Sequence, residues 1–243
     1  MSEETSGHLL GGTVRYTQFA SGFRTGIEPV LLAAAIPARN GERVLEAGTG
    51  AGAALLCLAA RLPGVAAVGA ERDPALAALA ARNIAANGWS ARLGVTIADV
   101  VETGATLGRF DHACANPPWH DPASTASADA ARRAAKQGSA GLVVSWASAL
   151  ASCLVRGGSL TFILPAGLLT EALAGLAAAE CGTRVLAPLW PKPARPAKLI
   201  LVQGRKGGRG RDRVIPGLVL HRPDGSPSEE AEQILRAGAA WPI

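Results

Sequence analysis

Short apolar runs alternate with longer helical patterns from residue 43 onward. Each run has the length of a β-strand, and most are followed by glycine, proline or an acidic residue before a helical stretch begins. This alternation is typical of a parallel sheet covered by helices on both faces. The pattern predicts seven strands, at residues 43–47, 65–70, 92–98, 110–115, 159–164, 184–189 and 198–203.

Helical patterns fill the intervals between these strands. Proline near the start of a helix and glycine after its end mark several boundaries, as at Pro29, Pro74 and Gly88. The expected helices span residues 28–36, 53–62, 74–87, 142–154 and 168–179. The chain is expected to divide into an N-terminal lid segment, residues 1–40, and one α/β domain, residues 41–243, which includes a C-terminal basic segment at 190–222.

The N-terminal segment has its own composition. Residues 1–13 are polar and contain glycine, so we expect them to be frayed. Residues 16–26 hold the only tyrosine and two of the four phenylalanines of a chain that is only 4% aromatic. That concentration predicts either a lid over a site or a strand that covers the core.

Composition narrows the class of protein. The 243 residues are 49% hydrophobic, which is enough for a sizeable core, and the four cysteines stand far apart without metal-ligand spacing. The first residues lack the runs of a signal peptide, and no stretch reaches the roughly 20 apolar residues of a membrane span. We therefore expect a cytoplasmic protein without a metal or a membrane partner. The formal net charge of +5 is compatible with a polyanionic partner.

Three alternating glycines, Gly48, Gly50 and Gly52, separate the first strand from the helix that follows. Glycines at this place allow a tight turn and close approach of a ligand to the backbone. Glu46 lies at the end of the strand, where a carboxylate would repel the pyrophosphate of a dinucleotide. A ligand that carries an amine or a sulfonium tolerates that charge.

Polar side chains also end the next three strands. Glu71 follows the second strand, where a carboxylate can accept the two hydroxyls of a ribose, and Asp99 follows the third, where it can accept from an adenine amino group. Because parallel strands end at one edge of a sheet, Glu46, Glu71, Asp99 and Asn116 are expected to lie together. Each alone could cap a helix or face solvent, and the set together predicts a binding site.

The loop after the fourth strand, Asn116 to Trp119, reads Asn-Pro-Pro-Trp. The side-chain oxygen of Asn116 and the carbonyl of Pro117 can each accept a hydrogen bond, and the prolines stiffen the loop. An amino group with two N–H donors would find both partners here, and the indole of Trp119 could stack on the attached ring. The loop is therefore suited to activate an aromatic amine, although Asn-Pro and Pro-Pro also occur in ordinary turns.

These motifs, at these spacings, resemble those of class I S-adenosylmethionine-dependent methyltransferases that modify amino groups. Within that group the chain is most similar to the bacterial valine-tRNA adenine N6-methyltransferase family, also through residues 23–32 (FRTGIEPVLL) and 218–225 (LVLHRPDG). The resemblance implies a Rossmann-like fold with a mostly parallel seven-stranded sheet, S-adenosylmethionine as cofactor, and methylation of an adenine amino group in RNA, expected to be tRNA. It implies a catalytic role for Asn116, Pro117 and Trp119, and cofactor binding by Glu46, Gly48, Gly50, Gly52, Glu71, Asp99 and Asn116. Trp119 departs from the commoner tyrosine.

Basic residues gather in the C-terminal segment. Arg205, Lys206, Arg209 and Arg211 are opposed only by Asp212, so we expect them to contact RNA phosphates. Lys192, Arg195 and Lys198 precede them. A flexible, solvated glycine-rich loop is the alternative for this segment.

Three other functions stay open at the level of sequence. A glutamine amide offers the same two donors, so a release-factor glutamine N5-methyltransferase would use the same loop, although only about 40 residues precede the first strand where those enzymes carry a helical domain. A guanine N2 methyltransferase acting on rRNA is a second possibility. A nicotinamide-dependent oxidoreductase, of a different class, could use the glycine loop.

Overall fold

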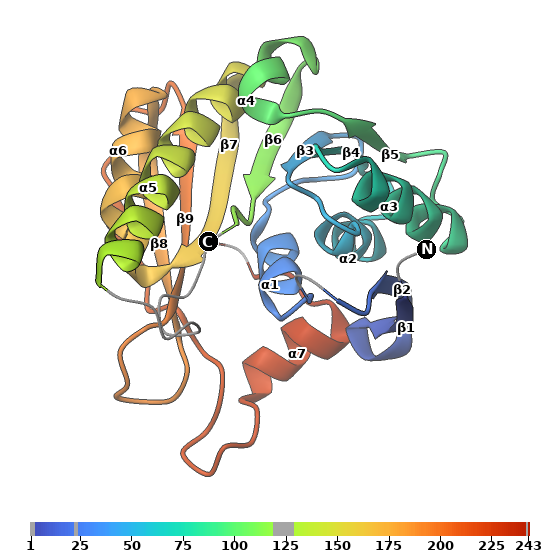
Figure 1. Cartoon of the computed structure of the whole chain (residues 1–243). Helices are drawn as coiled ribbons and strands as arrows, with labels where there is room; N and C mark the ends of the chain where they lie inside the picture. Colours follow the sequence, from blue (N-terminus) through green and yellow to red (C-terminus); the bar gives the residue numbers. More distant parts are fainter. Residues whose placement is uncertain (1–2, 22–23, 119–128, 242) are drawn as a thin grey trace.

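The computed structural model describes residues 3–21, 24–118, 129–241 and 243, and of residues 129–140 only the backbone. It is an α/β structure in which helices cover both faces of a central sheet (Figure 1). The strands are β1 Glu4–Leu9, β2 Val14–Phe19, β3 Arg43–Ala47, β4 Ala66–Glu71, β5 Leu93–Ile97, β6 Phe110–Ala115, β7 Leu154–Pro165, β8 Cys181–Trp190, β9 Leu199–Lys206, β10 Arg213–Val214 and β11 Leu218–Val219. The α-helices are α1 Glu28–Ala35, α2 Ala53–Arg61, α3 Pro74–Ala86, α4 Val100–Thr103, α5 Asp129–Ser152, α6 Leu169–Ala178 and α7 Glu229–Ala237.

The central sheet has the order β10-β8-β9-β7-β6-β3-β4-β5, with β11 also paired to β8. The pairs from β5 to β7 are all parallel, and β9 alone runs antiparallel to both of its neighbours. We call the edge at which the parallel strands end the carboxyl edge, and the opposite one the amino edge. Because β9 runs the other way, it starts at the carboxyl edge and ends at the amino edge.

The sheet has nine strands in the described part of the chain, so the expected number of seven was wrong. All seven expected strands are present, and β10 and β11 are the additional ones. Each additional strand has only two residues, which is too short to show an alternating pattern in the sequence. Both pair in parallel with β8 and extend the sheet beside it.

The core consists of two layers, one on each face of the sheet. Adjacent residues of a strand point to opposite faces, so Val44 packs with α1, α2 and α3, whereas Leu45 packs with α5 and α6. Ile163 and Phe162 of β7 divide in the same way, and all four side chains are fully buried. Burial on both faces explains why the strands read as continuous apolar runs. No helix in the described ranges is long and apolar enough to cross a membrane.

The N-terminal residues form an antiparallel hairpin of β1 and β2, so the expected fraying was wrong. The hairpin is fixed by side chains far away in the sequence. Asn83 of α3 is buried; its Oδ1 accepts from Thr17 N at 2.9 Å, and its Nδ2 donates to Thr17 O at 2.8 Å. Asn87 makes the equivalent pair of bonds with Arg15. Local composition could not reveal these partners.

Candidate active site

The three glycines of the loop after β3 all have positive φ, at 64° for Gly48, 55° for Gly50 and 88° for Gly52. Beyond this shared requirement, their surroundings differ. A Cβ at Gly48 would lie 2.8 Å from the Trp146 indole of α5, and one at Gly52 would lie 3.4 Å from Ala80 of α3. A Cβ at Gly50 would have nothing within 4 Å. Gly48 and Gly52 therefore serve packing, and Gly50 is the glycine that leaves open space for a ligand.

Glu46 is a buried carboxyl group beside this loop, with 4% of its surface exposed. The Thr49 hydroxyl donates to its Oε2 at 2.6 Å. Burial raises the pKa of Glu46 to about 7, against the opposing effect of the Thr49 hydrogen bond, and the neighbouring charge of Glu71 also raises it. Glu46 thus changes its charge near neutral pH, and a cationic ligand would favour the ionised form.

Glu71 joins the end of β4 to the glycine loop. Its Oε2 accepts from Gly50 N at 2.9 Å, and its Oε1 accepts from Asp73 N at 3.0 Å. Each carboxylate oxygen can accept more than one bond, so both can still take a ligand hydroxyl. The side chain is buried, and the two backbone donors hold its orientation.

Asp99 is partly buried and is the N-cap of α4, where its Oδ1 accepts from Val101 N at 2.9 Å. Among the hydrogen bonds of the described residues, its Oδ2 takes part in none. Asp99 therefore has a structural role as a cap, and its second oxygen is the one that can serve a ligand.

Asn116 directly follows β6, whose last residue Ala115 pairs with Ala47 of β3. Its Oδ1 is buried and has no hydrogen-bond partner within the described part of the chain. A buried acceptor without a donor is costly, on the order of 1–3 kcal/mol, which a ligand with an N–H group would relieve. Pro117 is buried and Pro118 exposed. Trp119 lies outside the described residues.

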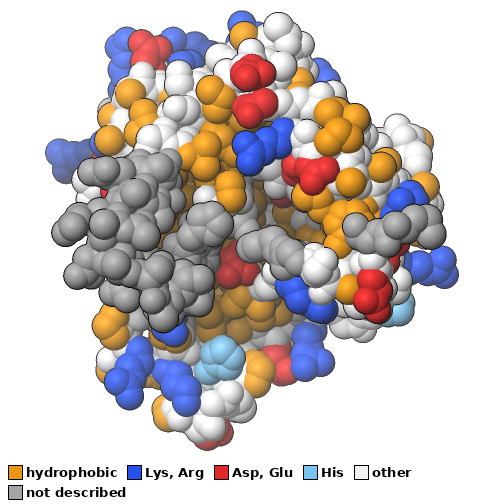
Figure 2. All heavy atoms as spheres, viewed as in Figure 1, with side chains coloured by type: hydrophobic (Ala, Val, Ile, Leu, Met, Phe, Trp, Pro, Cys, Tyr) orange, Lys and Arg blue, Asp and Glu red, His pale blue; other side chains and the backbone are white. Residues whose placement is uncertain are grey.

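The positions of these side chains follow from the strand order. The order reverses between β3 and β6, since β4 and β5 continue on one side and β7 on the other. Open α/β sheets bind ligands outside the carboxyl edge at this switch point. Figure 2 shows a hollow on this face, with acidic and hydrophobic side chains at its surface. The glycine loop, Glu46, Glu71, Asp99 and Asn116 all belong to this edge.

Several residues that shape the site were not predicted. Trp146 could not be predicted from local sequence patterns, because its contact with Gly48 joins elements that are far apart in the sequence. Asn83 also donates to Ala51 O at 2.9 Å, and so connects the hairpin to the glycine loop. Thr49 lies between Gly48 and Gly50. Its position three residues after Glu46 was the one feature of the sequence that could have predicted its hydrogen bond to that carboxyl group.

The basic residues of the C-terminal segment divide between the two edges. Leu199 pairs with Leu189, which places residues 190–198 at the carboxyl edge, and Lys206 pairs with Cys181 at the amino edge. Lys192, Arg195 and Lys198 are thus on the side of Asn116. Arg205, Lys206, Arg209 and Arg211 are not brought together with the strand-end carboxylates. No cluster of His, Cys, Asp or Glu suited to a metal is found among the described residues.

The fold is that of a Rossmann-like α/β protein, and its candidate ligand site lies at the switch point of the sheet. Comparison with known families gives the narrower class. Residues 26–168 match the family described as methyltransferase small domain, and the chain belongs to that family.

Two relatives carry the name tRNA1(Val) (adenine(37)-N6)-methyltransferase. The protein from Actinobacillus succinogenes is 34% identical over 145 residues, a match that spans 59% of this chain and 61% of that protein. The protein from Yersinia pestis is 28% identical over 240 residues, which cover 93% of each chain.

Solved structures agree with the fold. A predicted O-methyltransferase from Agrobacterium tumefaciens superimposes with a TM-score of 0.75 at 26% identity, over 89% of this chain and 99% of that one. A 16S rRNA N2 G1207 methyltransferase from Thermus thermophilus, in complex with AdoMet and guanosine, gives a TM-score of 0.58 at 21% identity, over 84% of this chain and 50% of that one. The second likeness concerns the fold alone.

Proposed function

We propose that this protein transfers the methyl group of S-adenosylmethionine to the exocyclic amino group of an adenine in RNA, and that the RNA is a tRNA. The names of the two relatives support the substrate, and family membership supports the reaction. The observation that carries the proposal is the buried Oδ1 of Asn116, which lacks a donor among the described residues. An amino group offers the donor that this oxygen needs.

The residues of the carboxyl edge suit this cofactor. The open space at Gly50 admits a ligand close to the backbone, and the two oxygens of Glu71 can accept the ribose hydroxyls. Glu46 provides negative charge for the cationic amino-acid end, and Asp99 Oδ2 can accept from the adenine amino group. Gly48 and Gly52 contribute through the shape of the loop.

The proposed mechanism depends on orientation. When bound, the cofactor supplies a methyl group on a cationic sulfonium. The lone pair of an adenine amino group is conjugated with its ring, which makes the nitrogen a poor nucleophile. If Asn116 Oδ1 and Pro117 O each accept one N–H bond, the nitrogen is drawn toward a tetrahedral shape and its lone pair is aimed. No strong base is required before the attack, because the N–H proton becomes acidic once the nitrogen has taken the methyl group from sulfur, and it can then leave to water. Such positioning contributes several kcal/mol, up to about 7–11 in the best cases.

Trp119 is proposed to hold the flipped base by stacking, a contact worth about 1–3 kcal/mol. The adenine must be unpaired, because a base inside a helix cannot bring its amino group into the loop. Within residues 1–40, the described part before α1 is proposed to act as a lid at the entrance, because α1 itself is buried in the core. The Tyr16 hydroxyl lies 2.6 Å from Thr25 Oγ1, and Thr25 N donates to Gln18 Oε1 at 3.0 Å, which orders the described part of this segment.

RNA is proposed to contact basic residues at both edges. Lys192, Arg195 and Lys198 are beside the site, and Lys192 Nζ donates to Pro223 O at 3.2 Å, which joins two loops of the carboxyl edge. Arg205, Lys206, Arg209 and Arg211 would contact phosphates farther away. Loss of each phosphate contact lowers the slope of log affinity against log salt by roughly 0.7–0.9.

The test is methyl transfer from labelled S-adenosylmethionine to purified tRNA, followed by digestion and mass spectrometry of the nucleosides. N6-methyladenosine as the product supports the proposal. N2-methylguanosine in rRNA, or methylated glutamine in a release factor supplied in parallel, would move the enzyme to another substrate class. If NAD stabilised the protein against heat and S-adenosylmethionine did not, the proposal that S-adenosylmethionine is the cofactor would be contradicted.

A further inference from the structure

A second concave site lies on the amino edge, across the sheet from the proposed methyl-transfer site. The cavity has a volume of about 380 Å³ and opens to solvent. It is lined by residues from the start of β7, the end of α6, the start of β8 and the loop after β9. The charged residues among them are Arg156, Glu180, Arg184 and Arg209.

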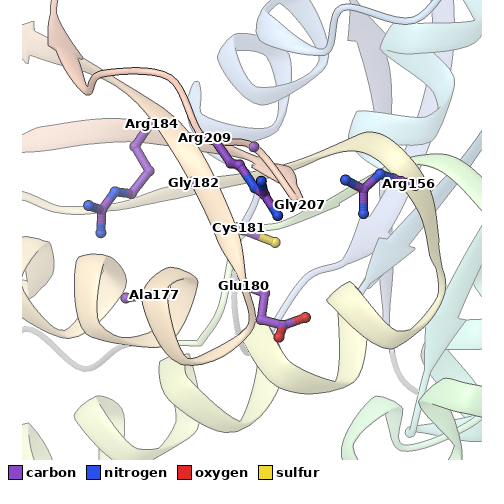
Figure 3. Close-up of a pocket in the computed structure, with 9 residues that line it drawn as sticks. Arg156, Ala177, Glu180, Cys181, Gly182, Arg184, Gly207 and Arg209 are labelled. Atoms are coloured by element: carbon purple, nitrogen blue, oxygen red, sulfur yellow. The ribbon is translucent and has the colours of Figure 1, made fainter.

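The charges around this pocket are only partly compensated. Arg184 is paired with Asp212 at 2.6 Å, and Lys206 with Glu180 at 3.5 Å. Neither Arg156 nor Arg209 has an acidic partner in the part of the chain that the structure describes. In Figure 3 the guanidinium groups of Arg156 and Arg209 are directed toward the space between them, while Arg184 points away. Two positive charges therefore face the pocket, and Glu180, the one carboxylate among its described lining residues, is paired with Lys206.

The loop that carries Arg209 is held in place. Gly207 N donates to Glu180 O at 2.8 Å, and Gly210 N donates to Thr183 Oγ1 at 2.7 Å. A Cβ at Gly182 would come within 2.3 Å of Gly208 O, so the glycines let the loop backbone pack directly on β8. Residues 209–213 are exposed, as a solvated loop would be, but these bonds fix the backbone on either side of Arg209. The backbone that carries Arg209 is thereby held before any ligand binds.

We infer that this pocket binds a phosphate group between Arg156 and Arg209. Guanidinium groups match the geometry of phosphate oxygens and form strong charge-assisted hydrogen bonds with them. Resting on the proposed function, the phosphate is one in the backbone of the RNA substrate. Arg205 and Lys206 are secondary, because Arg205 Nη1 donates to Gly157 O at 3.3 Å and Lys206 Nζ to Ala179 O at 3.0 Å.

The distance between the two sites suits a nucleic acid. β9 runs from Leu199 at the carboxyl edge to Lys206 at the amino edge, so at about 3.4 Å per residue the edges are roughly 24 Å apart. At the spacing of about 3.4 Å per nucleotide in B-form DNA this distance corresponds to roughly seven nucleotides, and the shorter rise of an A-form RNA helix makes it somewhat more. An arm of tRNA laid along the protein can therefore reach the phosphate pocket while an unpaired adenine occupies the carboxyl edge.

The experiment compares Arg156→Gln and Arg209→Gln with Arg213→Gln. Arg213 is an exposed arginine of β10 that does not line the pocket, so its substitution removes the same charge from the same part of the molecule. We expect each pocket variant to bind tRNA about tenfold more weakly, with the salt slope reduced by roughly 0.7–0.9. Arg213→Gln should bind tRNA like wild type and keep the wild-type salt slope. Equal losses in all three variants would overturn the pocket as a site.

Added inorganic phosphate tests whether the pocket binds a phosphate of the RNA backbone or a free phosphate ion. The melting temperature of wild type and of Arg213→Gln should rise with added phosphate, at constant ionic strength, and that of Arg156→Gln should not. A phosphate response that depends on Arg156, together with an unchanged tRNA salt slope, would overturn the RNA assignment in favour of a free phosphate. Absence of both effects would overturn the site itself. If wild type methylates no tRNA but the phosphate response persists, the proposed function fails and the pocket remains.

Discussion

The two edges of one sheet differ in charge and in how their loops are built. At the carboxyl edge the strands end in buried carboxylates, and Asn116 holds a buried acceptor that lacks a partner among the described residues. At the amino edge the pocket is lined by Arg156 of β7 and by Arg209 of the loop after β9, and neither has an acidic partner in the described chain. Both edges use glycines to bring backbone close to a neighbour, but the candidate methyl-transfer site is acidic and the pocket is basic. From this difference we infer that the carboxyl edge suits a cationic cofactor and that the pocket at the amino edge suits phosphate.

The largest expected effect is on chemistry at the carboxyl edge. Asn116→Ala removes an acceptor that is needed as the amine changes shape, so turnover should fall about 10²–10³-fold, while calorimetry should find cofactor affinity near that of wild type. Pro118→Ala changes the exposed neighbour and keeps both acceptors, so it serves as the control. An Asn116→Ala enzyme that turns over normally would remove Asn116 from the mechanism.

The pH dependence of stability tests the buried carboxyl group of Glu46 at the carboxyl edge. The pKa of Glu46 is raised from 4.5 to about 7, so between these values the folded protein binds more protons than the unfolded chain. The contribution of Glu46 to stability is therefore fully present below pH 4.5 and is lost as pH rises through about 7, by an amount on the order of 3 kcal/mol. Urea titrations of the ligand-free protein should show this decline, and Glu46→Gln should flatten it.

Cofactor affinity should show the opposite trend with pH. The ionised form of Glu46 attracts a cationic ligand, so S-adenosylmethionine should bind more tightly as pH rises through about 7. Calorimetry on wild type and Glu46→Gln across this range measures the effect. A wild-type affinity that is independent of pH would mean that Glu46 does not face the ligand.

Glu71 tests the cofactor site through hydrogen bonding. Glu71→Ala should weaken S-adenosylmethionine binding by about 1.5–3 kcal/mol, the range for hydrogen bonds to a charged group. Because Glu71 also accepts from Gly50 N, part of the loss would come through the loop. Glu102→Ala, an exposed carboxylate on α4, is the control and should bind normally. Unchanged affinity in Glu71→Ala would exclude Glu71 from the site.

The glycines of the loop separate packing from ligand binding. Gly48→Ala and Gly50→Ala both place an alanine at positive φ, at a cost of roughly 1 kcal/mol. Only Gly48→Ala also meets Trp146, so thermal unfolding should find it less stable by a further 1–3 kcal/mol or so. Gly50→Ala should instead reduce cofactor affinity. Equal stability of the two variants would mean that Trp146 does not pack against Gly48, and Trp146→Phe should partly restore Gly48→Ala.

The sequence was sufficient for features that depend on local pattern. The seven main strands and the glycine loop follow from alternation and spacing, and the common edge of the strand-end side chains follows from parallel pairing. The hairpin was missed because the residues that fix it, Asn83 on α3 and Asn87 at the C-cap of α3, are far away in the sequence. Arg156 was missed because only the pairing of β7 with β9 brings it to the loop of Arg209. Contacts between distant elements carry no local signal.

The central claim is that an adenine amino group in tRNA is methylated at the carboxyl edge. Its most direct test is mass spectrometry of N6-methyladenosine in tRNA from cells that lack this protein, complemented with wild type or with Asn116→Ala. We predict that the modified nucleoside disappears from one tRNA without the protein, returns with wild type, and stays absent with Asn116→Ala at equal protein levels. An unchanged content of N6-methyladenosine in cells without the protein would contradict the account.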